Sequence, residues 1–315
     1  MSKIPSSISV GYPLSILVTG GSSMVGKHLK KILPNAQYLS SKDCDLRKEA
    51  PTFHLFRTAQ PDVVVHLAAK VGGILDNINH PVEFFEENIL INNNVIRAAH
   101  QSGCKKIISI LSTCIYPDEV HPSEYPMAEA RLHSGPPTPT NFAYGYAKRC
   151  LAVQLAAYNQ QYNTEYSTLI PCNLYSEHDH FEGEKAHFLS SLISKIHKAK
   201  RENAKKINLL GTGSPLRQFM YAGDLAEAIK LTLDAEGVFN YNICTPENKS
   251  IKDIADIALE ACDAKHLTVE WDKSKPDGQY RKDACSKKFL KDFPEFKFTK
   301  LLEGIKKTYN IMGNE

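Results

Sequence analysis

The sequence lacks the features that mark several classes of protein. It has no apolar run near the ~18 residues that a membrane helix needs. Residues 1–13 show no basic start followed by an apolar core, as a secretory signal would. The net charge is only +3, which is too small to indicate a nucleic-acid partner. We therefore expect a cytoplasmic protein with no membrane partner and no nucleic-acid partner.

Paired cysteines are also missing. The eight cysteines are spread along the chain and none forms a C-x-x-C pair, which argues against a disulfide-stapled domain or a zinc ribbon. The chain has no internal repeat and no low-complexity segment. Its 315 residues, 42% hydrophobic and 23% charged, are ordinary for a globular protein with one large or two smaller domains.

Short apolar runs alternate with helical patterns in the first part of the chain. The runs cover residues 15–18, 63–67, 107–111 and 167–170, and the helical patterns include 82–99 and 144–158. Because strands separated by helical crossovers form parallel sheets, the sequence predicts an α/β fold: a Rossmann-type doubly wound parallel sheet with a smaller mixed α/β substrate lobe. We place the sheet domain at residues 1–170 plus 224–248, and the lobe at 171–223 plus 249–315.

A glycine-rich segment joins the first predicted strand to the first predicted helix. Glycines let the backbone approach phosphate groups closely, and a helix N-terminus offers free N–H groups to an anion. We expect this segment to bind the pyrophosphate of a dinucleotide; the alternative is a tight turn without a ligand. The segment consists of Gly20, Gly21, Ser22, Ser23, Met24, Val25 and Gly26.

The end of the second predicted strand selects between dinucleotides. An acidic residue at this position binds the ribose hydroxyls of NAD. This chain has Ser40, Ser41 and Lys42, whose side chains can donate to the 2′-phosphate of NADP. NADP is therefore the expected cofactor, and a solvated loop with an ordinary lysine is the alternative. Asp45 follows and is a candidate for contact with the adenine side.

Ser112, Tyr144 and Lys148 form a candidate catalytic set. Tyr144 and Lys148 are four residues apart on a predicted helix, so they share a face. Ser112 directly follows a predicted strand, at the sheet edge where ligands bind. We expect the Lys148 ammonium to lower the tyrosine pKa from about 10, so that Tyr144 can protonate a carbonyl that is being reduced. The alternative is a surface Tyr–Lys pair.

Cys114 lies two residues after Ser112 and is expected to point into the same pocket. A plain reductase needs no thiol there, whereas a sugar epimerase needs a base to remove a proton beside a ketone. The opposite face then needs an acid, for which His187 is the candidate. His178 and His180 compete for that role, and a structural role for each of these side chains is the alternative.

The whole pattern resembles the GDP-L-fucose synthase family, the 3,5-epimerase/4-reductases that act on GDP-4-keto-6-deoxymannose. The resemblance covers nearly the entire chain. The Ser-x-Cys combination with the histidine is more specific than the glycine-rich segment. The matching segments are residues 16–21, 66–73, 111–117, 141–149, 171–175, 215–219 and 275–278.

This resemblance implies a role for each candidate residue. Cys114 would be the epimerisation base and His187 the acid, while Ser112, Tyr144 and Lys148 would carry the reduction with NADPH as hydride donor. Further cofactor contacts would come from His187 and from Ile110, Leu111, Thr113, Pro171, Cys172, Asn173 and Leu174. The GDP-sugar would be bound by Lys195, Leu210, Arg217 and Asp277. Members of the family are typically homodimers, paired through helices that include the Tyr–Lys helix.

Three departures from the family pattern accompany the resemblance. Ser23 replaces the middle glycine of the dinucleotide loop, Ser176 replaces a glycine, and Leu210 stands where familiar members carry a tryptophan. A nucleotide-sugar 4-epimerase or dehydratase of the same superfamily is one alternative, but a dehydratase would carry an acidic pair at residues 113–114. The other alternative is a catalytically silent NADP-binding scaffold.

Overall fold

The computed structural model describes residues 14–183, 186–275 and 277–312. Its main element is a six-stranded sheet in the order β2-β1-β3-β4-β5-β9, in which every neighbouring pair is parallel. This confirms the predicted doubly wound sheet. The strands are β1 (Ile16–Thr19), β2 (Gln37–Leu39), β3 (Val63–His66), β4 (Lys106–Ile110), β5 (Glu165–Pro171) and β9 (Asn240–Ile243).

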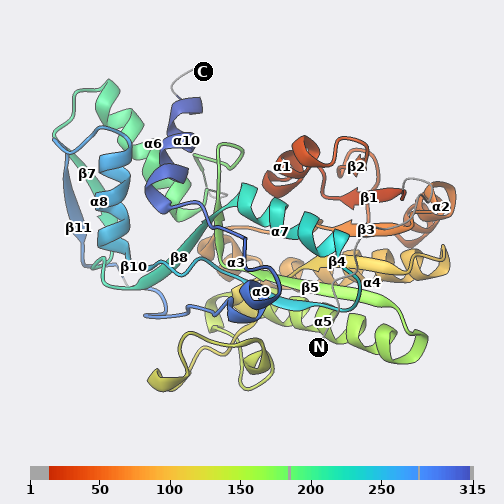
Figure 1. Ribbon diagram of the computed structural model, residues 1–315. Helices are drawn as coiled ribbons and strands as arrows, with labels where there is room; N and C mark the ends of the chain where they lie inside the picture. Colours follow the sequence, from red (N-terminus) through yellow and green to blue (C-terminus); the bar gives the residue numbers. More distant parts are fainter. Residues whose placement is uncertain (1–13, 184–185, 276, 313–315) are drawn as a thin grey trace.

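Helices cover both faces of this sheet (Figure 1). On one face α4 packs against α2 and α5, and on the other α1 packs against α7. The strand order reverses between β1 and β3, which is where ligands bind in open α/β sheets. The covering helices are α1 (Met24–Ile32), α2 (Glu49–Ala59), α4 (Pro81–Gln101), α5 (Phe142–Tyr162) and α7 (Ala222–Asp234), and the short α3 (Ile74–Asn79) precedes α4.

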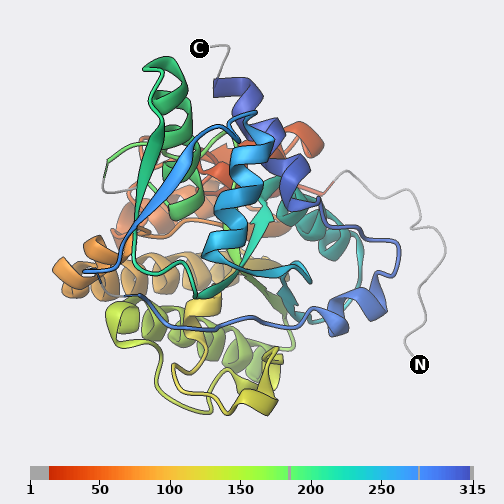
Figure 2. The same ribbon diagram turned by 90° about the vertical axis from the view of Figure 1, so that its left-hand side faces the viewer.

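A smaller set of elements lies beside the large sheet and forms its own core. Strands β6 (Asn173–Tyr175), β8 (Leu216–Tyr221) and β10 (Asn248–Ser250) make a mixed sheet. Strands β7 (Lys206–Leu210) and β11 (Thr268–Asp272) form a parallel pair beside α6 (Phe188–Arg201), α8 (Ile251–Ala261) and α10 (Leu301–Met312), as Figure 2 shows. This mixed arrangement agrees with the predicted substrate lobe.

The large sheet with its helices and the smaller set of elements each have their own cluster of buried apolar side chains. The last helices divide between the clusters: Phe289 of α9 (Lys287–Asp292) is buried in the cluster of the large sheet, whereas Ile305 of α10 is buried in the smaller one. The chain thus returns to the large sheet near its end. The division into two domains stays a prediction.

Among the described residues, no helix combines the length and the apolar character needed to cross a membrane.

Candidate active site

The glycine-rich segment joins β1 to α1, as predicted. Gly20 has a φ of +69°, and a Cβ there would lie 2.8 Å from the backbone nitrogen of Ala68. A Cβ on Gly26 would lie 2.5 Å from the carbonyl oxygen of Gly21. Ser23 is the N-cap of α1, and its hydroxyl accepts a hydrogen bond from the Gly26 N–H at 3.2 Å. The serine in place of the middle glycine therefore stabilises the helix start, and the loop remains a backbone cradle suited to a pyrophosphate.

The turn after β2 is closed by Asp43. The Ser40 N–H and hydroxyl both donate to the same carboxylate oxygen of Asp43, each at 2.7 Å. These bonds lower the pKa of Asp43. The Lys42 N–H donates to the Ser40 hydroxyl at 3.3 Å. The side chains of Ser41 and Lys42 are exposed, so they are better placed than Ser40 to donate to a phosphate.

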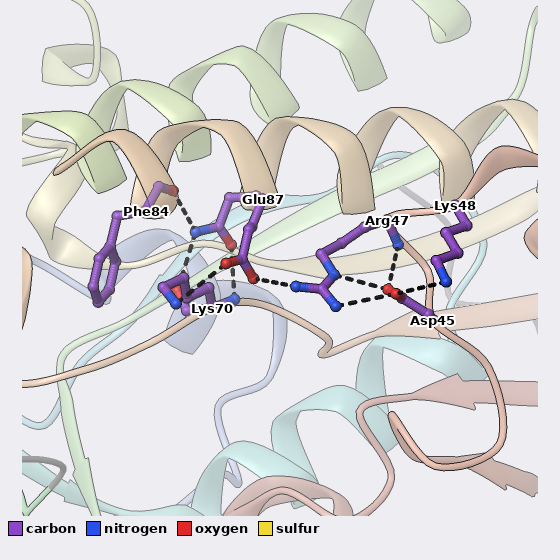
Figure 3. A network of polar contacts seen from close by, with 7 residues as sticks. Asp45, Arg47, Lys48, Lys70, Phe84 and Glu87 are labelled. Carbon is purple, nitrogen blue, oxygen red and sulfur yellow. Dashed lines mark hydrogen bonds and ion pairs between the residues drawn. The ribbon is translucent and has the colours of Figure 1, made fainter. Parts of the chain in front are cut away.

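A polar network fixes the loop that follows this turn (Figure 3). Arg47 donates to both carboxylate oxygens of Asp45, at 2.8 and 3.0 Å, and to Glu87 of α4 at 3.2 Å. Lys70, which follows β3, donates to the other oxygen of Glu87 at 3.3 Å, and its backbone pairs with the Asn88 amide. Asp45, the candidate for contact with the adenine side, is thus held by Arg47.

Ser112, Tyr144 and Lys148 come together at the carboxyl end of β4. Ser112 caps a short 3₁₀ helix, Thr113–Ile115, that begins directly after the strand. Lys148 on α5 is buried and donates to the Ile110 carbonyl at 2.8 Å. Its ammonium lies 5.9 Å from the centre of the Tyr144 ring. The helix spacing brings Tyr144 and Lys148 together near the end of β4, and the catalytic roles of the three residues stay a prediction.

The expected effect of Lys148 on Tyr144 is wrong. Burial raises the pKa of Tyr144, and the negative charge of the nearby Cys114 thiolate raises it further. Burial also lowers the pKa of Lys148 to about 8, so that the amine stays mostly protonated at pH 7. Desolvation is thus the largest influence on the pKa of both groups. Tyr144 is a neutral phenol at pH 7, which is the protonation state that a proton donor requires.

Polar side chains surround the Cys114 sulfur and donate hydrogen bonds to it. The Asn141 amide donates at 3.1 Å and the Lys282 ammonium at 3.5 Å. Burial alone would raise the pKa of the thiol, but the Lys282 charge and the hydrogen bonds from Ser112, Lys282 and Asn141 together lower it. A Cβ on Gly145 would lie 2.8 Å from the Cys114 carbonyl oxygen, so a glycine lets α5 approach the thiol segment. The geometry favours a thiolate.

A backbone bridge brings Lys282 to this place. The Met127 N–H donates to the Asp283 carbonyl and the Cys285 N–H donates to the Met127 carbonyl, both at 2.9 Å. The neighbouring Asp283 carboxylate pairs with Arg281 at 2.5 and 3.0 Å. The segment around Lys282 is thereby tied to a loop of the sheet domain, next to Cys114.

His187 is the N-cap residue of α6 and pairs with Asp179. Its Nδ1 lies 3.2 and 3.3 Å from the two Asp179 carboxylate oxygens. The Ser190 hydroxyl donates to one of these oxygens at 2.5 Å. The hydrogen bond with Asp179 raises the pKa of His187, and burial opposes this only in part. A histidine held by a carboxylate in this way is a good proton donor near neutral pH.

The two competing histidines have different surroundings. The Nε2 of His178 lies 3.7 Å from the Glu177 carboxylate, and burial lowers its pKa. The His180 side chain is exposed. His180 contacts Asp179 only through its backbone N–H, at 2.8 Å, whereas His187 contacts it through the imidazole. The surroundings therefore favour His187 as the acid.

Arg217 of the smaller lobe lies close enough to interact electrostatically with both Cys114 and Asp277. Arg217, on β8, donates to the Leu216 carbonyl at 2.8 Å. Burial lowers its pKa, while the charges of Cys114 and Asp277 raise it. Asp277 accepts from the N–H and the hydroxyl of Thr212, at 2.9 and 2.5 Å. Its carboxylate therefore fixes the turn after β7, and its contact with a GDP-sugar stays a prediction.

The remaining predicted residues have contacts of their own. Lys195 on α6 donates to the Asn208 carbonyl at 3.1 Å. Leu210 ends β7 with 65% of its side chain exposed. Asn173 donates to the Gln218 carbonyl at 2.8 Å and so orients β6 against β8. Their functional roles, like those of Ile110, Leu111, Thr113, Pro171, Cys172 and Leu174, stay predictions.

Sequence reasoning does not assign Asn141, Asp179 and Lys282 to the site. Asn141 directly precedes α5, so its position before the Tyr–Lys helix is a usable signal. Asp179 lies in a polar loop next to two histidines, and nothing local distinguishes it. Lys282 is one of several charged residues in a turn-rich segment, and only its long-range contact with Cys114 reveals it.

Comparison with known proteins supplies the family. The family model "NAD dependent epimerase/dehydratase family" matches residues 16–244. A GDP-L-fucose synthase of Dictyostelium discoideum is 38% identical over 309 residues, which cover 93% of this chain and 93% of that protein. The Escherichia coli K12 GDP-L-fucose synthase is 31% identical over 282 residues, which cover 85% of this chain and 87% of that protein.

A solved structure agrees with these relatives. The GDP-L-fucose synthetase of Naegleria fowleri bound to NADP superimposes with a TM-score of 0.87 and 35% sequence identity, covering 98% of this chain and 95% of that chain. The similarity includes the sheet, the smaller lobe and the segments that carry the site. The chain therefore belongs to the NAD dependent epimerase/dehydratase family, and GDP-L-fucose synthases are among its relatives.

Proposed function

We propose that this protein is a GDP-L-fucose synthase, which epimerises carbons 3 and 5 of GDP-4-keto-6-deoxy-D-mannose and then reduces the ketone with NADPH. The observation that carries the proposal is the Cys114 thiol, held by Asn141 and Lys282 two residues from Ser112. A reductase alone has no use for such a thiol, whereas an epimerase needs a base there. The GDP-L-fucose synthases among the relatives support the same substrate.

The chain offers a binding site that fits NADP. In the segment from Gly20 to Gly26, the backbone is packed so closely that a Cβ on either of these glycines would collide with backbone atoms. The segment leads into the N-terminus of α1. Ser41 and Lys42 lie at the end of β2, where they can receive the 2′-phosphate. NADPH, when bound, supplies the hydride for carbon 4.

Epimerisation uses the two faces of the sugar ring. The Cys114 thiolate takes the proton from the carbon beside the ketone, and Ser112 and Tyr144 donate hydrogen bonds to the enolate oxygen. His187 gives a proton to the same carbon from the opposite face, which inverts it. The site is left with a thiol and a neutral imidazole, which reset by exchange with solvent. The same steps serve carbons 3 and 5.

Reduction uses the phenol of Tyr144. As carbon 4 receives a hydride, negative charge develops on its oxygen and Tyr144 donates its proton there. Ser112 holds that oxygen in place. Lys148 has its buried ammonium on the Ile110 carbonyl, and it is placed to hold the nicotinamide ribose beside the ring. One set of groups thus stabilises the same oxygen in both reactions.

The GDP-sugar is held by the smaller lobe. Lys195 and Arg217 carry positive charge toward the diphosphate, and the planar guanidinium of Arg217 can make two parallel hydrogen bonds. Leu210 presents an exposed apolar side chain in place of the tryptophan of familiar members. Asp277 accepts a hydrogen bond from Thr212 and so fixes the turn between Leu210 and Arg217.

The protein acts as a homodimer in the cytoplasm. Large apolar side chains are exposed along α4 and α5, including Phe85, Leu90, Tyr146 and Val153. A second copy that packs on these helices would bury them, and such patches mark interaction sites. The eight cysteines, all within the described residues, are free, which suits a reducing compartment.

One assay tests the reaction. The protein is incubated with GDP-4-keto-6-deoxy-D-mannose and NADPH, the nicotinamide absorbance is followed, and the sugar is identified by NMR. Loss of NADPH with formation of GDP-L-fucose is expected. Reduction without inversion at carbons 3 and 5 would mean that the protein is a reductase and not an epimerase. Binding of NADPH with no consumption would favour the catalytically silent scaffold.

A further inference from the structure

Three metal-ligating side chains converge away from the proposed active site. His28 lies on α1, and Glu177 and His178 lie in the loop after β6. One donor atom from each residue lies within 4.8 Å of the other two. The Nε2 atoms of His28 and His178 lie 3.8 and 3.7 Å from different oxygens of the Glu177 carboxylate. None of the three has a part in the chemistry proposed above.

The burial of this cluster requires an explanation. His28 is only 6% exposed, and the Glu177 side chain is 3% exposed. Within the part of the chain that the structure describes, neither Nε2 atom has a hydrogen-bond partner, although both are buried. Buried polar atoms in folded proteins are almost always paired, so an unpaired atom points to a missing partner. Here two such atoms face the same carboxylate.

An ion pair does not account for the cluster. The distances of 3.7 and 3.8 Å are longer than hydrogen bonds. The Nε2 atoms of His28 and His178 thus face the Glu177 carboxylate without a hydrogen bond to it. An imidazole Nε2 is a common metal ligand. The surroundings thus match a ligand set better than a salt bridge.

We propose that His28, Glu177 and His178 bind a divalent cation of the zinc type. Two histidines and one glutamate are a known protein ligand set for Zn²⁺, with a solvent molecule in the fourth position. At bond lengths of about 2.1 Å, tetrahedral ligands lie roughly 3.4 Å apart. The three donor atoms now lie within 4.8 Å of one another, so a bound cation would draw each pair together by at most about 1.4 Å.

The neighbours of Glu177 suit this role. The Tyr221 hydroxyl donates to one carboxylate oxygen at 2.8 Å and so orients the ligand from outside. The Lys31 ammonium lies 3.6 Å from the other oxygen. This side chain is largely exposed, so it can turn into solvent when a cation arrives.

The site would link two parts of the proposed active site. His28 belongs to the helix that begins at the dinucleotide loop, whereas Glu177 and His178 directly precede Asp179, the partner of His187. A bound cation would hold the Asp179 loop against α1. This role rests on the proposed function, but binding of the cation does not.

Metal titration tests the site directly. The protein is stripped with EDTA, kept reduced with a phosphine, and titrated with Zn²⁺ by calorimetry and with Co²⁺ by visible absorption. We expect one equivalent to bind, with cobalt d–d bands and no thiolate charge-transfer band. His28→Gln and Glu177→Gln should each weaken binding at least tenfold. The matched control is His54→Gln, which removes a histidine of α2 that is exposed and should bind as the wild type does.

Thermal unfolding supplies a second measurement. Zn²⁺ should raise the Tm of the wild type and of His54→Gln, because the cation binds only the folded chain, and it should not raise the Tm of Glu177→Gln. If His28→Gln does not fold, Glu177→Gln, which keeps the shape of the side chain, decides the question. Equal affinity in wild type and Glu177→Gln, a thiolate band, or no binding at all would each overturn the site. None of these outcomes depends on the sugar assay.

Discussion

The Lys282 ammonium lies 3.5 Å from the Cys114 sulfur, although 168 residues separate the two in the chain. The Asn141 amide donates to the same sulfur from another direction. A thiol in apolar surroundings would keep its proton, and this pair of donors reverses that tendency. The proposed base therefore depends on a residue far from it in sequence.

Replacement of this lysine should raise the Cys114 pKa. Because Lys282 lowers the pKa of the thiol in the folded protein, the thiolate is present above that pKa and is lost as the pH falls through it. In Lys282→Met the loss should occur at higher pH. The rate of Cys114 alkylation at neutral pH should then fall, by up to about tenfold for every pH unit by which the pKa rises. The measurement is the pH dependence of Cys114 alkylation by iodoacetamide, followed by mass spectrometry of its peptide.

Two variants control this measurement. Lys282→Arg keeps a positive charge and should retain most of the reactivity. Lys288→Met removes an exposed lysine nearby in the sequence and should leave the profile unchanged. An alkylation profile that stays in place in Lys282→Met would mean that the contact does not set the protonation of the thiol.

Loss of the phenol should stop reduction. Tyr144→Phe keeps the ring but removes the proton that the proposed mechanism gives to the carbonyl oxygen. Removal of a positioned proton donor costs about 10²–10⁴ in rate, whereas NADPH binding should stay nearly intact. Stopped-flow NADPH oxidation and a fluorescence titration of the cofactor measure the two effects. Turnover close to that of the wild type would rule out Tyr144 as the donor.

Replacement of the thiol should separate the two chemistries. Cys114→Ser keeps a hydrogen-bonding group, but a hydroxyl ionises much less readily than a thiol. In heavy water the variant should place little deuterium at carbons 3 and 5, yet slowly reduce the ketone without inversion. NMR gives both the deuterium content and the product stereochemistry. If Cys114→Ser makes GDP-L-fucose at the wild-type rate, Cys114 has only a packing role and is not the base.

The histidine should fail in a different way. In His187→Asn the thiolate can still remove protons, so deuterium should enter while inversion stays incomplete. Asp179→Asn should act through the histidine: the hydrogen bond that raises the pKa of His187 is weakened, so the pKa falls. The acid form then persists only to a lower pH, and the alkaline limb of the epimerisation profile should move down. An unmoved limb would leave Asp179 with a structural role only.

The cofactor preference should follow the loop after β2. Ser41 and Lys42 expose their side chains where a 2′-phosphate would lie, so kcat/KM should be higher with NADPH than with NADH. Lys42→Ala should reduce the advantage of NADPH and change the NADH reaction little. Steady-state kinetics with both cofactors measure this. Equal kcat/KM values for the wild type would refute the preference.

Local patterns predict most of the fold. Apolar runs and residue spacing predict a strand at 107–111 and a helix at 144–158, and the structure has Lys106–Ile110 and Phe142–Tyr162. The same spacing places Tyr144 and Lys148 together, because helix geometry is local. The expected lowering of the Tyr144 pKa is wrong, because desolvation depends on how the whole site packs.

Long-range contacts set the limit of such prediction. Lys282 reaches Cys114 through a backbone bridge to Met127, and no spacing rule relates positions so far apart. Ser23 shows the opposite case: it departs from the glycine-rich pattern, yet it caps α1 with its hydroxyl. The effect of its side chain can be judged only once the helix start is known.

The bridge at Met127 also has a consequence for the protein while it is being made. A ribosome adds the 168 residues between Cys114 and Lys282 in roughly ten seconds or more at ~5–20 residues per second. During that time the thiol lacks its ammonium neighbour and behaves as an ordinary, sluggish cysteine. Because the thiolate is the reactive form of a cysteine, the sulfur gains the part of its reactivity that Lys282 supplies only after the late segment docks.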